Sequence, residues 1–403
     1  MAKFNNKISI SLITVSFISL PLVLFLRKKL SMLSRRKRGE IPRSDNALEL
    51  TNPENTDDIL SFLRNVLPGW SDVKTAEIKR VSGALTNSVF FVTALTETPK
   101  ASPRKILLRV YGTGADQVID RERELKFLEM LGSLNIGPSI LALFQNGRVE
   151  QFLPSRTLTN QDIRNQETSR QIARLIARLH SNVPGPSTKD VVPEVWANIN
   201  KWYDIAVKLT TTEMREASIE ILNLDALRDE INELRHYVDM LDSPIVFSHN
   251  DAQCGNFLRL TDGTNELVIV DFEYSGYNYR GFDLANHFCE WAYDYHSEEP
   301  HKMKPDLYPT ILEQNNFLRA YLEVEKKSRN DKIEVELAQR RLECDVFSLT
   351  SHVLWGLWGV LQHYQSQIPF EYLPYAAGRL EEFRRVKEGI YKQLIESRGQ
   401  SSQ

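Results

Sequence analysis

The chain has 403 residues, a length that suits one large two-lobed core or two modest domains. Hydrophobic residues make up 42% of it and charged residues 26%, a composition typical of a soluble globular protein. Its formal net charge of -3 gives no support to nucleic-acid binding, because that function needs a concentrated basic surface. The three cysteines, Cys254, Cys289 and Cys344, lack metal-ligand spacing and are too few for a disulfide framework, so they favour a reducing compartment.

The N-terminal segment 8–26 is apolar or hydroxylated without one charge, near the lower length limit for a membrane-spanning helix. A run of Lys and Arg follows it from Arg27. By the positive-inside rule this pattern predicts a single anchor that leaves the rest of the chain in the cytoplasm, on the face of an internal membrane such as the endoplasmic reticulum. A peripheral apolar leader is the alternative, since Pro21 and four serines weaken the span. Residues 1–55 are therefore predicted to be this segment and a basic, polar linker.

The next part of the chain, 56–153, predicts an N-lobe made of an antiparallel sheet plus helices. Alternating apolar residues and turn signals indicate its elements, which are a helix at 57–67, strands at 77–81, 88–95 and 105–111, a helix at 116–131, and strands at 140–144 and 149–152. Asn146-Gly147 is a strong tight-turn pair between the last two strands.

Helical spacing dominates the rest, 154–395, and predicts a larger C-lobe. Helical segments are indicated at 172–180, 195–241, 283–293, 308–327, 333–365 and 375–397, with one strand pair at 256–260 and 267–270. Residues 396–403 read as a flexible tail. The expected fold class is α+β, with two lobes.

A polar constellation surrounds the predicted strand pair of the C-lobe. Asp251 is followed five residues later by Asn256, and Asp271 closes the hairpin. Phosphoryl transfer needs the reacting groups to be aligned and the charge on the phosphate to be neutralised. A carboxylate that accepts a proton and two hard oxygen ligands for Mg²⁺ can supply both. Asp251 would accept the proton of an attacking hydroxyl, while Asn256 and Asp271 would hold the metal. A His-Asn-Asp triplet alone is often a turn, and an Asp after a strand is often only a terminator, but this conjunction is much rarer.

These residues resemble the choline/ethanolamine kinase family, whose catalytic loop reads His-Asn-Asp-x-x-x-x-Asn and whose metal motif matches the segment 271–291, Asp-Phe-Glu-Tyr-Ser-Gly-Tyr-Asn-Tyr-Arg-Gly-Phe-Asp-Leu-Ala-Asn-His-Phe-Cys-Glu-Trp. The resemblance covers about residues 57–392. It implies a protein-kinase-like fold, ATP and Mg²⁺ as cofactors, and Asp251, Asn256 and Asp271 as the catalytic residues. Many members of the family are dimers, so a homodimer is a further expectation.

The resemblance also implies a nucleotide site. The loop 83–87 is similar to the family's phosphate-covering loop, and Arg109 stands where the family places the cation that meets the phosphates. Glu124 is the best candidate to pair with Arg109, with Glu122 as the alternative. The inter-lobe hinge corresponds to Glu150, Gln151 and Phe152, and His180 is expected to be structural. The residues implied to bind nucleotide are Gly83, Thr86, Asn87, Arg109, Glu124, Gln151 and Phe152.

An ammonium-bearing acceptor would be recognised by aromatic faces and a carboxylate. Trp355 and Trp358 lie at i and i+3 on one predicted helix face, where core packing is the alternative reading. The resemblance implies an acceptor site made of Gln253, Tyr274, Glu290, Tyr295, Trp355, Trp358 and Tyr375. Aromatic residues at these positions favour choline over ethanolamine, and both remain open as substrates.

The resemblance thus implies ATP-dependent phosphorylation of choline to phosphocholine, the first step of phosphatidylcholine synthesis through CDP-choline, with some ethanolamine activity. Ser82 stands where some members carry a basic residue, which leaves one cation fewer near the nucleotide. The alternatives are an ethanolamine kinase, an aminoglycoside- or sugar-type kinase of the same fold, and a membrane-tethered pseudoenzyme. The aromatic, Glu-bearing pocket argues against a sugar acceptor, and the intact Asp251, Asn256 and Asp271 argue against a pseudoenzyme.

Overall fold

The computed structural model describes residues 48–81, 87–95, 103–111, 121–134, 136–186, 191–212, 222–326, 333–366 and 368–401. The predicted anchor at 8–26 and the loop residues Gly83 and Thr86 lie outside these ranges. Across the ranges that are described, no helix has both the length and the apolar character needed to cross a membrane.

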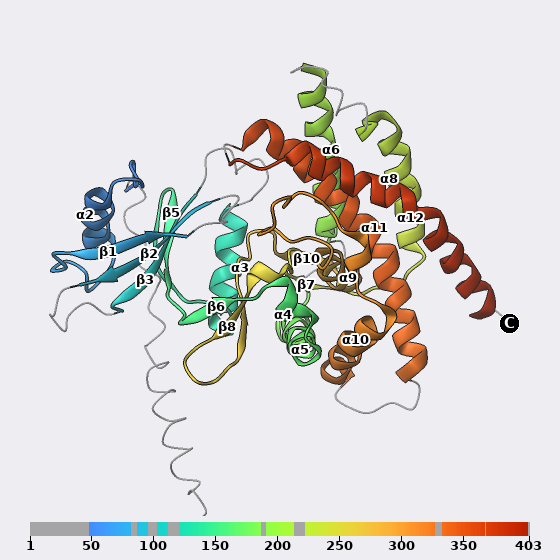
Figure 1. Cartoon of the computed structure of the whole chain (residues 1–403), viewed down its shortest axis with the longest axis horizontal. Helices are drawn as coiled ribbons and strands as arrows, with labels where there is room; N and C mark the ends of the chain where they lie inside the picture. Colours follow the sequence, from blue (N-terminus) through green and yellow to red (C-terminus); the bar gives the residue numbers. More distant parts are fainter. Residues whose placement is uncertain are drawn as a thin grey trace, which may run out of the picture.

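The N-lobe is a five-stranded antiparallel sheet in the order β1-β2-β3-β5-β4, accompanied by the helices α2 and α3 (Figure 1). Its strands lie within about two residues of the predicted ones. The elements are α2 (Thr56–Val66), β1 (Ala76–Arg80), β2 (Asn87–Ala94), β3 (Lys105–Tyr111), α3 (Arg121–Ser133), β4 (Ile140–Phe144) and β5 (Gly147–Gln151).

Alternation along the strands creates the apolar core of this lobe. In β2, Phe90, Val92 and Ala94 are buried on one face, against the apolar side of α2. The side chain of Asn55 caps α2 by accepting the backbone N–H groups of Asp57 and Asp58.

The core of the N-lobe begins earlier than residue 56. Leu50, in the predicted linker, is only 3% exposed and belongs to the apolar cluster of the sheet. Its backbone N–H donates to Asn146 Oδ1, and its carbonyl accepts from Asn146 Nδ2, both at 3.0 Å. The turn pair Asn146-Gly147 therefore also fastens the incoming chain to the lobe.

The C-lobe is mostly helical and packs around the long helix α11, which contacts α6, α8, α9, α10 and α12 (Figure 1). Its elements are β6 (Ser155–Thr157), α4 (Asn160–Arg164), α5 (Gln166–Asn182), α6 (Glu194–Thr212), α8 (Leu224–Asp239), β7 (Ile245–Ser248), η2 (Cys254–Asn256), β8 (Phe257–Leu260), β9 (Leu267–Ile269), β10 (Gly276–Tyr279), α9 (Arg280–Glu290), η3 (Pro305–Leu307), α10 (Ile311–Lys326), α11 (Ile333–Gln365) and α12 (Tyr372–Ser401).

Three short strands were not predicted, because three or four residues carry too little periodicity. They are β6, which joins β8 and β9 in one sheet, and β7 with β10, which form a two-stranded ladder. The predicted flexible tail at 396–403 is also corrected, because α12 continues to Ser401. Contact of Arg398 Nη1 with the carbonyl of Met240 holds this last part of the helix on α8.

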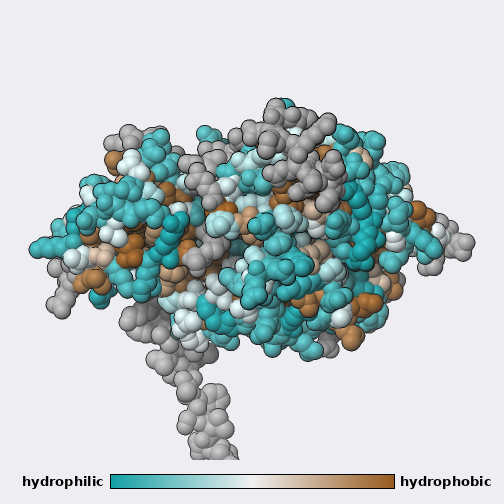
Figure 2. Space-filling model, turned by 45° about the horizontal axis from the view of Figure 1, so that its top comes forward, coloured by the Kyte–Doolittle hydropathy of each residue, from teal (hydrophilic) through white to brown (hydrophobic). Residues whose placement is uncertain are grey.

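Helices α11 and α12 approach closely at Gly359. A Cβ atom there would stand 3.0 Å from the carbonyl oxygen of Tyr372 and 3.1 Å from the ring of Tyr375. The missing side chain lets Tyr375 reach Trp358, whose ring centroid is 6.0 Å away. The outer surface in the view of Figure 2 is largely hydrophilic, with scattered apolar residues, as is usual for a globular protein.

We expect Leu50→Ala to destabilise the protein by about 2–5 kcal/mol, the range for truncating a buried leucine. Leu48→Ala is the matched control, because Leu48 is 38% exposed and should change the free energy of unfolding by less than about 0.5 kcal/mol. Urea titration of both variants provides the measurement. Equal effects of the two substitutions would show that Leu50 does not belong to the core.

Candidate functional site

The loop 249–256, which is predicted to be catalytic and is called the catalytic loop from here on, follows β7, and Asp283 of α9 fixes its backbone. Asp283 is fully buried, and its carboxylate accepts the backbone N–H groups of His249 (2.8 Å) and Asn250 (2.7 Å). His180 Nε2 lies 2.9 Å from the same carboxylate, and its Nδ1 lies 2.8 Å from Tyr321 Oη. His180 thus has the structural environment that the sequence predicts.

Asn250 adopts the left-handed conformation, with φ of 67°. This conformation costs a residue with a side chain roughly 1–2 kcal/mol. Its side chain is held at both ends, since Nδ2 donates to the carbonyl of Tyr274 (2.9 Å) and Oδ1 accepts from Asn278 Nδ2 (2.8 Å). The buried hydrogen bonds offset the strain and turn the chain sharply just before Asp251.

Asp251 and Asn256 lie together at the two ends of this loop. Asn256 Nδ2 donates to the backbone oxygen of Asp251 (2.8 Å) and to its Oδ2 (2.9 Å), which leaves Asn256 Oδ1 as the atom suited to a metal. Burial, together with the negative charges of Glu290 and Asp271, raises the pKa of Asp251 well above its ordinary value.

Asp271 follows β9 and is also left-handed, with φ of 68°. His249 links the two loops, because its Nε2 donates to the carbonyl of Val270 (2.9 Å) while its Nδ1 accepts from the backbone of Asp251 (3.3 Å). Burial acts to raise the pKa of Asp271, but the neighbouring guanidinium of Arg109, whose Nη1 lies 3.0 Å from Asp271 Oδ1, outweighs it and lowers the pKa.

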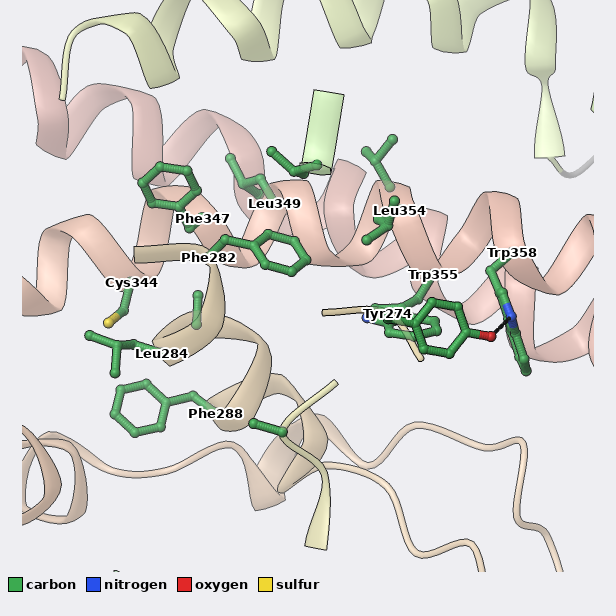
Figure 3. Packing of buried hydrophobic residues seen from close by; sticks show 14 of the residues in the cluster. Tyr274, Phe282, Leu284, Phe288, Cys344, Phe347, Leu349, Leu354, Trp355 and Trp358 are labelled. Atoms are coloured by element: carbon green, nitrogen blue, oxygen red, sulfur yellow. Dashed lines mark hydrogen bonds between the residues drawn. The ribbon is translucent and has the colours of Figure 1, made fainter. Parts of the chain in front are cut away.

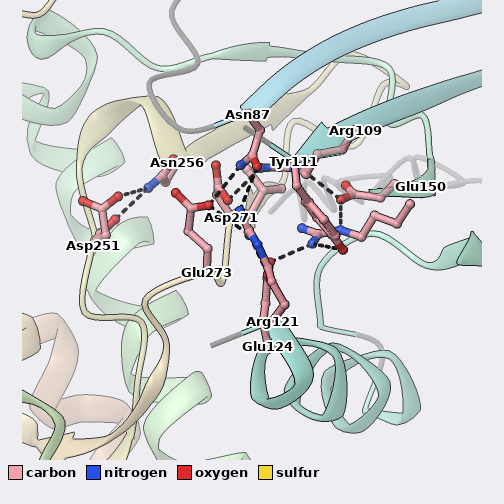
Figure 4. A network of polar contacts seen from close by, with 12 residues as sticks. Asn87, Arg109, Tyr111, Arg121, Glu124, Glu150, Asp251, Asn256, Asp271 and Glu273 are labelled. Carbon is pink, nitrogen blue, oxygen red and sulfur yellow. Dashed lines mark hydrogen bonds and ion pairs between the residues drawn. The ribbon is translucent and has the colours of Figure 1, made fainter. Parts of the chain in front are cut away.

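Carboxylates and guanidinium groups alternate between the lobes (Figure 4). The chain of ion pairs runs from Asp271 to Arg109 (3.0 Å), Glu150 (3.3 Å), Arg148 (2.6 Å), Glu124 (2.7 Å), Arg121 (2.9 Å) and Glu273 (3.6 Å). Buried charges are tolerated only when they are paired in this way. Burial, Asp271 and Glu124 together raise the pKa of Glu273 to about 7.

The predicted pairing of Glu124 with Arg109 is wrong. Arg109 and Arg148 are cross-strand neighbours on β3 and β5, and both contact Glu150. Glu124 reaches Arg148 and Arg121 instead. The physical reason is register, because Arg148 on the adjacent strand occupies the place between Arg109 and the helix.

Asn87 and Arg121 connect the N-lobe to the metal motif. Asn87 Nδ2 donates to Glu273 Oε2 (3.0 Å), and Arg121 Nη2 donates to Asn87 Oδ1 (3.1 Å). The guanidinium of Arg121 also lies over the ring of Tyr111, 4.2 Å from its centroid. Asn87, predicted to bind nucleotide, therefore lies at the junction of the lobes.

The predicted hinge lies where the chain leaves β5 for β6. Gln151 ends β5 with an exposed side chain, and its backbone N–H donates to the carbonyl of Ser139 (2.8 Å). The ring of Phe152 packs edge-on against Phe91, with centroids 5.4 Å apart, and lies beneath Lys105 Nζ at 3.9 Å. Backbone and side chains thus fix this crossing point.

The aromatic residues among the predicted acceptor residues form a continuous cluster, and Figure 3 shows three of them, Tyr274, Trp355 and Trp358. Trp355 packs edge-on against Tyr274 (5.2 Å between centroids) and Trp358 (5.6 Å), and Trp358 packs against Tyr375 (6.0 Å). Tyr375 in turn contacts Tyr293 (5.3 Å). Trp358 Nε1 donates to Tyr274 Oη (2.9 Å), so the indole orientation is fixed.

Glu290 lies at the end of this cluster with both carboxylate oxygens engaged. Oε2 accepts the hydroxyl of Tyr295 (2.8 Å), and Oε1 contacts Arg379, a fully buried residue of α12. Arg379 Nε also donates to Tyr375 Oη (3.1 Å), and its guanidinium lies 4.3 Å from the centroid of the Tyr293 ring. The carboxylate expected to meet the ammonium group is therefore already charge-paired.

Gln253 has a local partner. Its Oε1 accepts the backbone N–H of Gly255 (3.0 Å) and so caps the short helix η2 within the catalytic loop. In this conformation its side chain supports the loop that carries Asp251 and Asn256.

The family model described as "Choline/ethanolamine kinase" matches residues 78–384. The chain belongs to the choline/ethanolamine kinase family. It is 34% identical to "Probable choline kinase 2" of Arabidopsis thaliana, over 82% of this chain and 92% of that protein. It is 38% identical to "Choline/ethanolamine kinase" of Homo sapiens, over 81% of this chain and 85% of that protein.

A crystal structure of choline kinase from Cryptosporidium parvum Iowa II is similar, with a TM-score of 0.67 and 27% identity, over 84% of this chain and 97% of that one. The predicted protein-kinase-like, two-lobed α+β fold is confirmed by this similarity and by the observed lobes.

The donor set of this choline/ethanolamine kinase family member fits Mg²⁺. Asn256 Oδ1 and the Asp271 carboxylate are hard oxygen ligands held on adjoining loops. Among the described residues, no group of three or more His, Cys, Asp or Glu side chains could hold a metal ion. Mg²⁺ at these two residues would thus complete its coordination with phosphate oxygens and water, as is usual for this ion.

Sequence reasoning assigned no role to several residues that shape the site. They are Arg121, Arg148, Glu273, Asn278, Asp283, Asn286 and Arg379. Three of them lie on or just before α9, within the motif on which the resemblance rests. These three are Asn278, Asp283 and Asn286. The signal that could have identified them is the recurrence of polar residues along an otherwise apolar segment.

His287 supplies a test based on pH. Its Nδ1 donates to the carbonyl of Ala252 (2.8 Å) and its Nε2 accepts from Trp291 Nε1 (3.2 Å), so only the neutral imidazole satisfies both partners. Burial lowers its pKa from 6.5 to about 4. Because the folded state disfavours protonation, the stabilisation is complete above pH 6.5 and is lost as the pH falls towards 4.

We expect the stability advantage of the wild type over His287→Asn to shrink by about 2–3 kcal/mol between pH 7.5 and pH 4.5. Asparagine can keep the bond to Ala252 but does not titrate. Urea unfolding at both pH values gives the measurement, and the difference between the two proteins cancels the other titrating groups. A difference that stays constant with pH would contradict the assignment.

Proposed function

We propose that this protein transfers the terminal phosphoryl group of ATP to the hydroxyl of choline, giving phosphocholine, and accepts ethanolamine less well. The observation that carries the proposal is that the catalytic loop and the aromatic cluster are joined by a hydrogen bond. Asn250, which sets the position of Asp251, is hydrogen-bonded to the backbone of Tyr274, a member of the aromatic cluster. A proton acceptor and a cage for a cation are thereby held side by side.

Each residue of the loop has a chemical task in this reaction. Asp251 accepts the proton of the attacking hydroxyl, and Asn256 orients its carboxylate through Nδ2. Asn256 Oδ1 and Asp271 hold Mg²⁺, which neutralises charge on the phosphate oxygens when it is bound. Arg109, beside Asp271, adds a guanidinium that can grip phosphate oxygens.

The cluster favours a quaternary ammonium group. Aromatic faces attract a cation without needing hydrogen bonds, with roughly 0.5–2 kcal/mol per contact. A primary ammonium keeps three N–H donors that need acceptors, and each oxygen of Glu290 already accepts one hydrogen bond, from Tyr295 or from Arg379, which leaves fewer acceptor positions for it. Desolvating such a group without partners is costly, so choline should be preferred.

An ethanolamine kinase is the second candidate, because the same cage can admit a smaller ammonium group. For either substrate the product would supply phospholipid synthesis. An N-terminal anchor at 8–26 would hold the enzyme on the cytoplasmic face of an internal membrane, where lipid-forming enzymes consume the product. That anchor and the homodimer stay predictions from the sequence and the family resemblance.

We expect Asp251→Asn to lower kcat with choline by about 10²–10⁴-fold, because it removes the proton acceptor while keeping the side-chain shape. ADP release is measured with choline, ethanolamine and an aminoglycoside as separate acceptors. Asp262→Asn is the matched control, the same change at an exposed position on the β8–β9 hairpin, and should stay within about twofold of the wild type.

Wild-type turnover with the aminoglycoside alone would refute the proposed acceptor. Turnover that Asp251→Asn leaves intact would refute the assigned base.

Tyr295→Phe should narrow the preference for choline over ethanolamine. The substitution keeps the ring but frees Glu290 Oε2, which a primary ammonium can then use and a trimethylammonium cannot. We expect the ratio of kcat/KM for choline to that for ethanolamine to fall at least about threefold, because even a modest net contribution from one added hydrogen bond is of that size.

Tyr293→Phe is the matched control for this experiment. The Tyr293 ring stacks on Tyr295 with centroids 5.8 Å apart, and its buried hydroxyl lacks a hydrogen-bond partner within the parts of the chain described. Removing that hydroxyl frees no acceptor, so the ratio should not change. An equal fall in both variants would mean that Glu290 does not set the preference.

A further inference from the structure

Asn286 of α9 is a fully buried asparagine whose amide oxygen and amide nitrogen are both hydrogen-bonded. Its Oδ1 accepts the indole Nε1–H of Trp355 and the hydroxyl of Ser351, each at 2.8 Å, both from α11. Its Nδ2 donates to the backbone carbonyl of Asn250 at 3.3 Å. One amide group therefore joins the aromatic cluster to the catalytic loop.

The contact on the loop side acts on the peptide that leads into Asp251. The carbonyl of Asn250 belongs to that peptide, and its orientation fixes the direction in which the Asp251 backbone begins. Asn250 is held in a left-handed conformation, with φ of 67°, which persists only where surrounding contacts determine it. Asn286 supplies one of those contacts, and Asp283, one turn earlier on the same helix, supplies another.

The contact on the acceptor side acts on a ring of the cluster. Trp355 packs against Tyr274 and Trp358, and its only polar atom, Nε1, points to Asn286. The planar amide fixes the angle between its oxygen and its nitrogen. A rotation of the Trp355 indole that keeps its hydrogen bond must therefore shift the donor that holds the Asn250 carbonyl.

We propose that Asn286 is a positioning residue that couples occupation of the aromatic cage to the alignment of Asp251. This inference rests on the proposed function, because it takes the cluster to be the acceptor site. A cation seated against Trp355 orients the indole, and Asn286 transmits that orientation to the peptide before the base. Binding of the acceptor then contributes to kcat as well as to KM.

The test is a double-mutant cycle of Asn286→Asp and Trp355→Phe. Asn286→Asp keeps oxygens that can accept from Trp355 and Ser351 but loses the N–H donated to Asn250. Trp355→Phe keeps an aromatic face and loses the indole N–H. We expect each single variant to lower kcat for choline at least about fivefold while the KM for ATP stays within about twofold. The double variant should lose at least about fivefold less than the product of the single losses.

Trp358→Phe is the matched control for the cycle. It removes an indole N–H from the same cage, but that N–H donates to Tyr274 Oη rather than to Asn286. Its loss should multiply with that of Asn286→Asp. If the kcat losses of Asn286→Asp and Trp355→Phe also multiplied in the double variant, the proposed coupling would be overturned.

Trp355→Phe alone keeps the proposal testable if Asn286→Asp does not fold. A ring that only binds the acceptor would raise KM and leave kcat unchanged, which would overturn the coupling, whereas a lower kcat supports it. The measurements use whichever amino alcohol the wild type turns over. A preferred substrate other than choline would thus correct the proposed function while the coupling is still decided.

Discussion

The carboxylate of Asp283, buried in the C-lobe, accepts two consecutive backbone N–H groups of the catalytic loop and faces the imidazole of His180. Burial works to raise its pKa, but these donors outweigh burial and lower it, so the group remains ionised. Charge-assisted hydrogen bonds of this kind are roughly twice as strong as neutral ones. They can hold Asn250 in a left-handed turn that would otherwise relax and carry Asp251 away.

The rest of the site extends from that turn in two directions. Towards the metal motif, His249 bridges the backbone of Asp251 and the carbonyl of Val270. Towards the aromatic cluster, Asn250 contacts Tyr274, and Asn286 contacts Trp355. Because α9 carries Asp283, Asn286 and Glu290 on successive turns, one helix contacts the loop and the aromatic cluster and ends with the carboxylate of Glu290.

Charge pairing sets the relation between the lobes. The alternation from Asp271 to Glu273 through three arginines places a cation beside the metal-motif carboxylates without leaving a buried charge alone. Breaking one buried pair is costly because its partner remains desolvated, so the arrangement favours a defined approach of the lobes. Arg109 and Asp271 are consequently held as neighbours across the two lobes.

Local pattern was enough to predict the strands of the N-lobe and to single out Asp251, Asn256 and Asp271 as a candidate phosphoryl-transfer site. Strand alternation, a tight turn and a fixed spacing are properties of neighbouring residues, and these do not depend on the rest of the chain. Short strands such as β7 and β10 were not predicted. They pair with each other across about 30 residues of the chain, and four residues show too little alternation to indicate a strand.

The amino-acid order by itself indicated the family, and it predicts which residues are catalytic and which aromatic residues form an acceptor site. Only the tertiary structure decided which charge meets which, giving Glu124 to Arg148 and Glu290 to Arg379. The physical reason is that an ion pair depends on distance in space, and Arg379 on α12 is separated from Glu290 on α9 by 89 positions of the chain. Residue type states what a side chain can bind, and packing selects its partner.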